Sequence, residues 1–382
     1  MPPKKKQHYV PQCILKNFTN EQNQFYLFQV LKNKIIDRMV PYKDHCYTDY
    51  LYGKDGVWEN WLGEHEKEIA PVFRLILAGT DLSNEQEILV KRFILVQHMR
   101  TEKAIDRNFN IMADLYEKII PLLAKKEGLD ISPIIARRYA QEHINKFDRT
   151  EIAMQDMTFV EENINHFDDL RLVILYADKE TFACSDHPVS ISNLFHRSGG
   201  IGVDCAGLIV TMPISPNYCL MLIDDGIYDY ENGKRKVVLS NTDIKKLNYR
   251  QFVQCKEIVF SANNNTLENI KEHFESIYID APLRDLYKQT GMTDPILINL
   301  KVIEMKKSDH SILKEIIPKF YARDEFNGFY NLITKAEFRP YGDDINSMFH
   351  RFGSSSDIPD KYHFVGSEYP NLIKKYYINR GR

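Results

Sequence analysis

The first residues whose types could do chemistry form a short polar segment near the start of the chain. His8 and Gln12 flank Pro11, whose ring fixes its own φ and favours an extended conformation of the preceding residue. Such a rigid segment could hold both side chains toward a cleft. Because histidine titrates near neutral pH, His8 is the natural general acid or base there, and Gln12 could position a substrate. The alternative is a terminal strand whose polar groups only satisfy neighbouring backbone atoms.

An arginine in a predicted helix is the second candidate. Helical spacing places Phe93, Gln97 and Arg100 on one stripe, which continues to Ala104 and is apolar on either side. An arginine on an inward stripe needs a partner, because a buried unpaired charge is strongly unfavourable. The partner could be a protein carboxylate, for which we name Asp186. It could also be a bound anion such as phosphate, with Gln97 positioning the substrate.

The third candidate is the sequence Ser185-Asp186-His187-Pro188, which directly follows an apolar segment. Residues on loops after strands are favoured positions for functional groups. Asp186 could orient His8 or Arg100, and His187 could be a second acid–base group or a metal ligand, or could position the substrate. Ser-Asp-x-Pro is equally good turn chemistry, since the aspartate accepts hydrogen bonds from backbone donors and the proline presets the turn. Both interpretations stay open.

Two acidic groups could gather a divalent metal. The first is Glu64-His65-Glu66 with Glu68, but the spacings H-x-x-x-H and H-E-x-x-H are absent, so a buried, hydrogen-bonded His65 is the better interpretation. The second is Glu304-Met305-Lys306 with Asp280 and Asp294 upstream, a pattern that could serve phosphodiester cleavage. Such triplets arise freely in a chain with 27% charged residues. We therefore assign no metal ligand and leave the cofactor unknown, with a divalent metal as an open alternative.

Composition limits the partners and the compartment. A net charge of −3 gives no overall attraction to nucleic acid, so that partner is neither required nor excluded. The six cysteines lack a C-x-x-C pair, which favours reduced thiols over disulfides or zinc. Phosphate-loop, dinucleotide-binding and nucleophile-elbow motifs are absent. With no apolar leader and no run of about 18 apolar residues, we expect a cytoplasmic protein without a membrane segment.

The elements that must position these residues change character along the chain. Ser83 supplies an N-cap for one long predicted helix, and from about residue 170 short apolar runs between turn residues predict strands instead. Helices followed mostly by strands favour an α+β fold, with a helical N-terminal half and then a mainly antiparallel sheet region with a few helices. The predicted helices are 58–79, 83–126, about 133–164, 242–254 and 266–277; the predicted strands are 24–31 (a hairpin with the segment after Asn33), 172–176 and 181–184 (a returning pair), 208–214 and 218–223 (a second pair), 257–261 and 296–305.

Length favours two packed subdomains, because 382 residues exceed what one hydrophobic core usually supports. Residues 1–265 form the first predicted domain, with a helical part to about residue 169 and a sheet-rich part at 170–265. Residues 266–382 form an aromatic-rich C-terminal extension packed on it. The aromatic side chains of that extension could offer a surface to a partner protein.

Four segments together resemble a known family. The N-terminal His8-Tyr9-Val10-Pro11-Gln12, followed by Leu15-Lys16-Asn17-Phe18, is similar to the signature of the mostly bacterial domain of unknown function 4238. Its helix motif, its Ser-Asp-x-Pro-Val turn and its Pro-Leu-Ser-Pro strand end follow in the same order. The resemblance covers roughly residues 4–265 and implies a fold grouping without an activity. The matching segments are 8–18, Gln97 with Arg100-Thr101, 185–189 and 213–216. The sequence departs from the family pattern at Cys13, where an aromatic residue is common, and at His187, where asparagine is common.

Two functions remain in competition. The first is a hydrolase, acting on phosphodiesters or nucleic acid, in which His8 is the acid or base, Arg100 grips an anionic group and Asp186 orients His8 or a metal-bound water. The second is a non-catalytic protein-binding module in which the same residues are a structural polar network. A toxin or defence effector acting on nucleic acid is a third alternative, suggested by the family type. The discriminating observation is whether His8, Arg100 and Asp186 meet at an open cleft.

Overall fold

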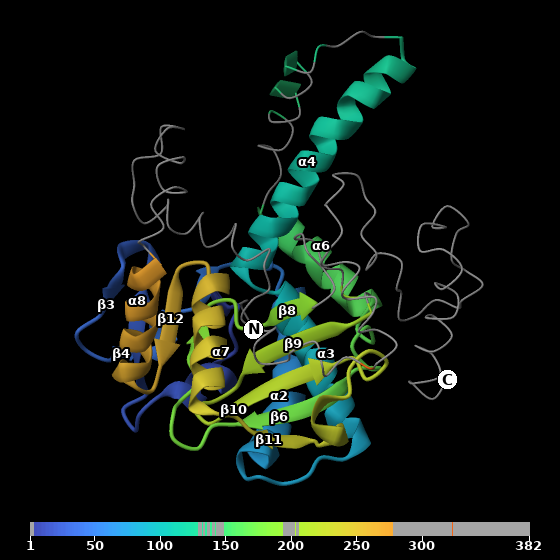
Figure 1. The fold of residues 1–382 in the computed structure, drawn as a ribbon. Coiled ribbons are helices and arrows are strands. Elements are labelled where there is room, and N and C mark those ends of the chain that lie inside the picture. Colours follow the sequence, from blue (N-terminus) through green and yellow to red (C-terminus); the bar gives the residue numbers. More distant parts are fainter. Residues whose placement is uncertain are drawn as a thin grey trace.

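A computed structural model describes residues 4–128, 149–193 and 206–277 of the chain, together with positions 132, 134–135, 138–139, 142, 203 and 323. The described residues form short N-terminal strands, then a helical middle, then a mainly antiparallel sheet region with helices (Figure 1). The predicted α+β order is therefore confirmed at this level. Within these residues, no helix has both the length and the hydropathy that crossing a bilayer requires.

The N-terminal segment is built from short strands. The predicted hairpin is confirmed: β2 pairs antiparallel with β3, and the turn between them ends at Asn33, whose φ of 45° is left-handed. Asparagine tolerates that conformation because its short polar side chain can hydrogen-bond locally. The element bounds are β1 (Lys6–His8), α1 (Gln12–Leu15), β2 (Gln24–Gln29), β3 (Lys34–Ile35), β4 (Val40–Pro41) and β5 (Tyr47–Asp49), with β1 paired to β5 and β4 to β2.

The helical middle corrects one prediction. The long helix expected at 83–126 is two helices, because Thr101 leaves the helical conformation and caps a new one, its hydroxyl accepting from the Ala104 backbone N–H. Ala104 therefore does not continue the stripe of Phe93, Gln97 and Arg100. Ser83 caps the first of the two helices with a complete capping box, as its sequence position predicts. The helices are α2 (Val57–Leu77), α3 (Asn84–Met99), α4 (Glu102–Lys126) and α6 (Arg149–Glu162).

Two sheets follow, and their pairing corrects a second prediction. The segment 181–184 does not return along 172–176: β7 pairs with β12, and β6 lies between β10 and β11 in the other sheet. The β9–β10 hairpin is confirmed. The order of strands is β11-β6-β10-β9-β8 in one sheet and β3-β2-β12-β7 in the other, and among these described strands only the β11–β6 pair is parallel. The strand bounds are β6 (Arg171–Tyr176), β7 (Cys184–Ser185), β8 (Ser190–Asn193), β9 (Leu208–Pro213), β10 (Tyr218–Ile223), β11 (Lys236–Val238) and β12 (Ile258–Ser261).

The last described helices are α7 (Asn241–Gln254) and α8 (Asn264–Ile277). Ser240 caps α7, its hydroxyl accepting from the Asp243 backbone N–H. Most of the predicted extension at 266–382, including the predicted strand at 296–305, lies outside the described residues, so the domain division stays a prediction. One described residue of the extension, Arg323, donates its backbone N–H to the Ile227 carbonyl at 2.9 Å.

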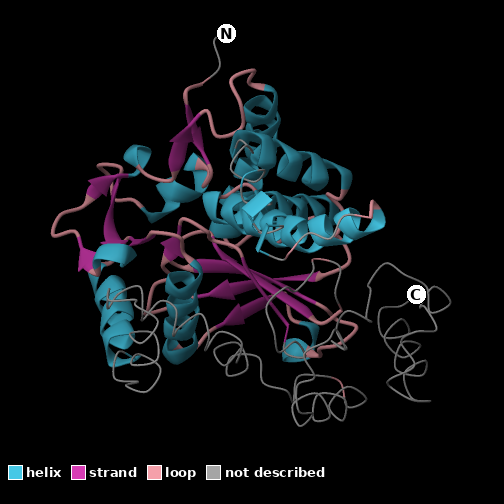
Figure 2. Cartoon of the chain, turned by 90° about the horizontal axis from the view of Figure 1, so that it is seen from above, coloured by secondary structure: helices cyan, strands magenta, loops and turns pink. Residues whose placement is uncertain are grey.

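One large hydrophobic core joins the N-terminal segment, helices α2, α3, α4 and α6 and the sheet β11-β6-β10-β9-β8. It includes Leu15 near the N-terminus, Phe93 of α3, Met157 of α6 and Leu220 of β10. Figure 2 shows the helical middle gathered along one side of the strands. The helical part and the sheet-rich part thus share a core, which fixes α3, the start of α4 and the loop after β7 relative to one another.

Candidate functional site at the junction of α3 and α4

Arg100 ends α3 and is almost completely buried, with 1% of its surface exposed. Its Nη1 donates to Glu66 Oε1 at 2.9 Å and its Nη2 to the His8 carbonyl at 2.6 Å. Burial acts to lower the pKa of Arg100, but the Glu66 carboxylate and Tyr52 outweigh it and the pKa is raised. The predicted need for a partner is confirmed, but naming Asp186 as that partner was wrong: the helix α2 carboxylate of Glu66 takes the role.

Asp186 is also buried, and its carboxylate binds backbone. It accepts hydrogen bonds from the N–H groups of Lys256 at 2.7 Å, Glu257 at 2.7 Å and Ile258 at 3.1 Å. Burial raises the pKa of Asp186 to about 6, although the three backbone donors act to lower it. The carboxylate therefore fastens the loop after β7 to the start of β12. It accepts from backbone donors, as the turn interpretation expects, but these donors lie about 70 positions along the chain and not in its own turn.

His8 contacts Arg100 through its backbone and not through its ring. The ring is half-buried and packs against Tyr47, with 5.5 Å between ring centroids. Its Nε2 is buried with no hydrogen-bond partner within the described chain. Burial lowers the pKa of His8, against the nearby Lys43 carbonyl and Glu66, which raise it. The structure thus brings His8 and Arg100 together, whereas Asp186 bonds elsewhere.

The two glutamines expected to position substrate lie on different elements. Gln97 is fully buried in α3 and donates to the Tyr9 carbonyl at 2.8 Å. Gln12 is partly exposed at the first position of α1. A glutamine not singled out from the sequence, Gln7, clamps the same segment: it donates to the Gly53 carbonyl at 3.0 Å and accepts from the Tyr52 N–H at 2.7 Å. Gln97 thus holds the N-terminal segment on α3, and Gln7 holds it on the loop before α2, and both amides satisfy backbone groups.

His187 faces the start of α4. Its Nδ1 lies 2.5 Å from the Thr101 hydroxyl, and its ring centroid lies 5.6 Å from that of His98. All three residues are buried. His98 Nε2 lies 3.1 Å from Arg107 Nη1, and burial together with Arg107 lowers the pKa of His98 well below its usual value. A neutral His98 accepting from the guanidinium fits both observations.

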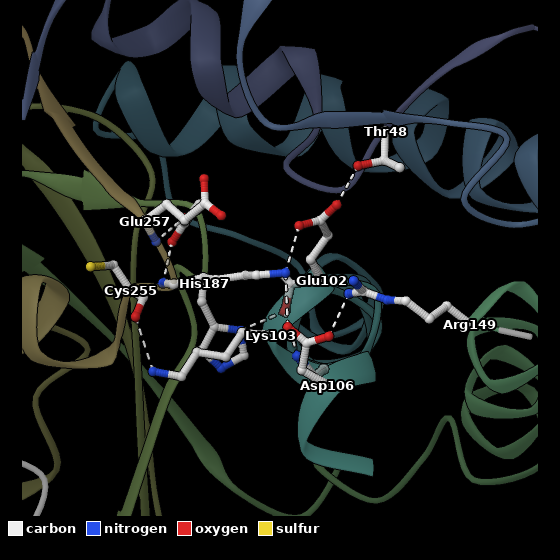
Figure 3. A network of polar contacts seen from close by, with 12 residues as sticks. Thr48, Glu102, Lys103, Asp106, Arg149, His187, Cys255 and Glu257 are labelled. Carbon is white, nitrogen blue, oxygen red and sulfur yellow. Dashed lines mark hydrogen bonds and ion pairs between the residues drawn. The ribbon is translucent and has the colours of Figure 1, made fainter. Parts of the chain in front are cut away.

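An ionic network lies at the start of α4, on the same side as His187 (Figure 3). Lys256 Nζ lies 2.8 Å from Glu102 Oε2 and 2.8 Å from Asp106 Oδ2. Asp106 also pairs with Arg149, and Glu102 accepts from the Thr48 hydroxyl. Two carboxylates and two cations thus balance in charge. The network joins α4 to β5, α6 and the loop before β12.

Sequence reasoning missed this network, and one signal pointed to it. Thr101 followed by the acidic Glu102 is a helix start signal, which would have broken the long helix at the right place. No local signal marks Lys256, because its partners lie about 150 positions earlier in the chain and only the fold brings them together.

The metal interpretations receive no support from the described residues. Those residues contain no cluster of three or more histidine, cysteine, aspartate or glutamate side chains that could hold a metal ion. Glu66 is paired with Arg100, Glu64 with Lys67, and His65 Nδ1 lies 3.0 Å from the Trp61 carbonyl. The second group considered, Glu304 to Lys306 with Asp280 and Asp294, lies outside the described residues.

Comparison with known proteins gives one match. The model of the family described as "Protein of unknown function (DUF4238)" matches residues 6–265. Neither the curated proteins nor the solved structures that were searched contain a match. The matched span includes the N-terminal segment, α3, the loop after β7 and the loop before β12, so the whole junction lies within it.

Proposed function

The chain belongs to the DUF4238 family, and from its geometry we propose that it is a non-catalytic protein-binding module. In this proposal His8, Arg100 and Asp186 are a structural polar network that fixes the N-terminal segment and the loop after β7. The partners described above support it, because Arg100 and Asp186 already hold protein groups and are 1% and 3% exposed. Arg100 Nε lacks a partner in the described chain, but it is sealed from solvent and so cannot meet a substrate.

The observation that carries the binding role is the outer face of α4, which extends away from the sheets (Figure 1). Ala104 and Ile105 bury the start of the helix against the body, and the same side continues outward as exposed apolar residues. At 3.6 residues per turn they fall within an arc of roughly 120°. Exposed apolar faces of this kind mark interaction surfaces. The residues of this outer α4 face are Ile111, Ile119, Leu122 and Leu123, of which Leu122 is 66% exposed.

The occupant we propose is a partner protein that offers an apolar groove. An amphipathic helix enters such a groove with anchors spaced along one face, as the outer α4 face provides. Lys125 and Lys126 at the end of the helix favour an acidic rim on the partner. The C-terminal surface considered from the sequence lies outside the described residues and stays a separate expectation.

The test begins with a photo-crosslinking amino acid at Leu123, used in cells, and mass spectrometry of the crosslinked chain. The identified protein is then purified and its binding measured with wild type and with Leu122→Glu. We expect binding at least tenfold weaker for Leu122→Glu at an unchanged melting temperature, because a charge would enter a desolvated contact. Asn110→Glu, on the exposed opposite side of α4, is the matched control and should bind like wild type.

Equal binding by Leu122→Glu and wild type would contradict the proposal. The purified chain could instead form a concentration-dependent dimer that the Leu122→Glu substitution dissociates. The outer α4 face would then bind a second copy of the chain, and the proposal that its partner is a different protein would be contradicted. Light scattering over a hundredfold range of protein concentration separates these outcomes.

One observation favours a hydrolase as the second candidate. A hydroxyl within hydrogen-bond distance of an imidazole, as for Thr101 and His187, is the arrangement of an activated nucleophile. Against it, Thr101 has no exposed surface and its hydroxyl already caps α4. Turnover of bis(p-nitrophenyl) phosphate or single-stranded DNA by wild type, abolished in Thr101→Val, which lacks the hydroxyl, or in His187→Ala, would favour this candidate. Equal background rates in all three proteins would eliminate it.

A further inference from the structure

Helix α7 holds the segment after β7 with polar side chains from its C-terminal half. Gln251 accepts from the Ser185 hydroxyl at 2.9 Å and donates to the Pro188 carbonyl at 2.9 Å, and Gln254 donates to the His187 carbonyl at 2.9 Å. Neutral side chains suit these neutral partners. Arg250 lies in the same part of α7 and faces the same segment, but it carries a charge.

The contacts of Arg250 are all with neutral groups. Its Nε donates to the Ser190 hydroxyl, and its Nη2 donates to the Ser192 hydroxyl and to the Ile191 carbonyl at 3.0 Å. No carboxylate of the described residues pairs with it, whereas Arg100 has Glu66. Burial alone lowers the pKa of Arg250 to about 10, so the group is still a cation at neutral pH. A partly buried guanidinium whose partners are all neutral favours an anion as its counter-charge.

The free hydrogen-bonding positions around Arg250 are donors. Its Nη1 has no partner in the described chain and is not sealed from solvent. The hydroxyls of Ser190 and Ser192 each accept from the guanidinium, which leaves their O–H hydrogens to donate. Both serines point to one side of β8, and the register places the buried Thr211 of β9 beside Ser190 on that side.

We propose that Arg250, Ser190 and Ser192 form a binding site for a phosphate-type oxyanion. The ligand must accept from Nη1 and from the two serine hydroxyls. A tetrahedral oxyanion directs its oxygens in several directions and fits such an arrangement. A planar carboxylate fits the paired Nε and Nη2 edge of a guanidinium best, and that edge is already used by the two serines.

This site is independent of the proposed binding face on α4. It lies between α7 and β8, the edge strand of the five-stranded sheet, and none of its three residues takes part in the polar network at the junction of α3 and α4. A phosphate-type group bound there supplies the missing charge and fastens the edge strand to α7. The bound group can be free phosphate or a phosphomonoester on a larger molecule, since both offer the same oxygens.

The first test uses inorganic phosphate as the probe. Isothermal titration and thermal melting are run in phosphate and in chloride at equal ionic strength, on the full-length protein. We expect saturable binding of phosphate and a higher melting temperature by mass action. The Arg250→Gln variant should bind at least about tenfold more weakly, in line with the loss of charged hydrogen bonds. Arg235→Gln, which removes an exposed arginine paired with Glu87, should bind like wild type.

Two additions keep the test decisive if Arg250→Gln does not fold. Ser192→Ala removes one hydroxyl without adding volume and should weaken phosphate binding about tenfold. In wild type labelled with ¹⁵N-arginine, phosphate should shift the side-chain resonance of Arg250. That resonance is identified as the one missing from the Arg250 variant. If the variant does not fold, it is assigned through the resonances of neighbouring residues in α7. A phosphate effect no larger than that of chloride would overturn the proposal. Equal responses to acetate and phosphate would overturn the tetrahedral assignment, and tighter binding of a phosphomonoester than of phosphate would identify the larger ligand.

Discussion

At the scale of single residues, the sequence indicated which side chains need partners but not which partners they have. Arg100 was expected to be buried and paired, since an inward arginine has no other stable arrangement. Its carboxylate, Glu66, lies on α2, 34 positions earlier, and was considered only as a metal ligand. To predict that Glu66 and not Asp186 pairs with Arg100, one must know how α2 packs against α3. The apolar periodicity of the sequence does not contain that packing angle.

The pairing of Arg100 predicts a large effect on stability. Arg100→Ala removes the cation from a buried pair and leaves Glu66 and the His8 carbonyl without their donor. We expect the free energy of unfolding to fall by about 3 kcal/mol, measured by urea denaturation. The control Arg235→Ala breaks an exposed pair and should change it by less than about 1 kcal/mol. Equal small effects for both variants would show that the buried pair is not a structural element.

Asp156 of α6 predicts a pH dependence. Its Oδ1 accepts from Asn108 Nδ2 at 2.6 Å, its Oδ2 is buried without a partner in the described chain, and burial raises its pKa to about 6. The unfolded value is about 3.8. Between the two pKa values the folded state binds more protons, so the stabilising contribution of protonated Asp156 is complete below the unfolded pKa and is lost as the pH rises through 6.

The comparison of wild type with Asp156→Asn isolates that contribution. The amide cannot ionise, so the difference in unfolding free energy between the two proteins should shift against wild type by about 2 kcal/mol from pH 4.5 to pH 7. Other titrating groups, including His98, act in both proteins and cancel in the difference. A pH-independent difference would contradict the raised pKa.

At the scale of elements, the sequence predicted which segments are helices and strands better than where they end or what they pair with. Apolar periodicity located α2 and the helical stretch that contains α3 and α4, because it directly reports burial. The break at Thr101 was missed because apolar residues continue on both sides of it, and only the cap interrupts the pattern. The strand at 181–184 was assigned to the wrong neighbour because a short turn favours a hairpin but does not require one.

Thr101 therefore carries a testable role as the cap of α4. Thr101→Ala removes the acceptor for the Ala104 N–H and the hydroxyl beside His187. We expect a loss of about 1 kcal/mol of unfolding free energy, the usual value for a cap. Thr101→Ser keeps the oxygen and should recover most of it. If serine destabilises as much as alanine, packing of the threonine methyl and not the cap would be the origin of the effect.

At the scale of the whole molecule, contacts between distant segments decide the architecture. Strand β2 from the N-terminal segment lies between β3 and β12, so the sheet β3-β2-β12-β7 combines residues more than 200 positions apart. Asn17 donates to the Ile214 carbonyl at 2.9 Å, which ties the part of the chain before residue 170 to the sheet-rich part. The two parts that share this core both lie within the first predicted domain, 1–265, so the predicted division at residue 265 stays a prediction.

The shared core predicts that the helical and sheet-rich parts unfold together. Both tryptophans of the chain, Trp58 and Trp61, lie on α2 and report on the helical part. Cys219 is fully buried in β10 and reports on the sheet through thiol labelling resolved by mass spectrometry. Because one set of apolar contacts holds both, the urea midpoints from tryptophan fluorescence and from Cys219 labelling should coincide. A Cys219 midpoint clearly separated from that of the tryptophans would mean that the sheet keeps its own core, and the residues packed between α3 and β10 would then stabilise only an interface.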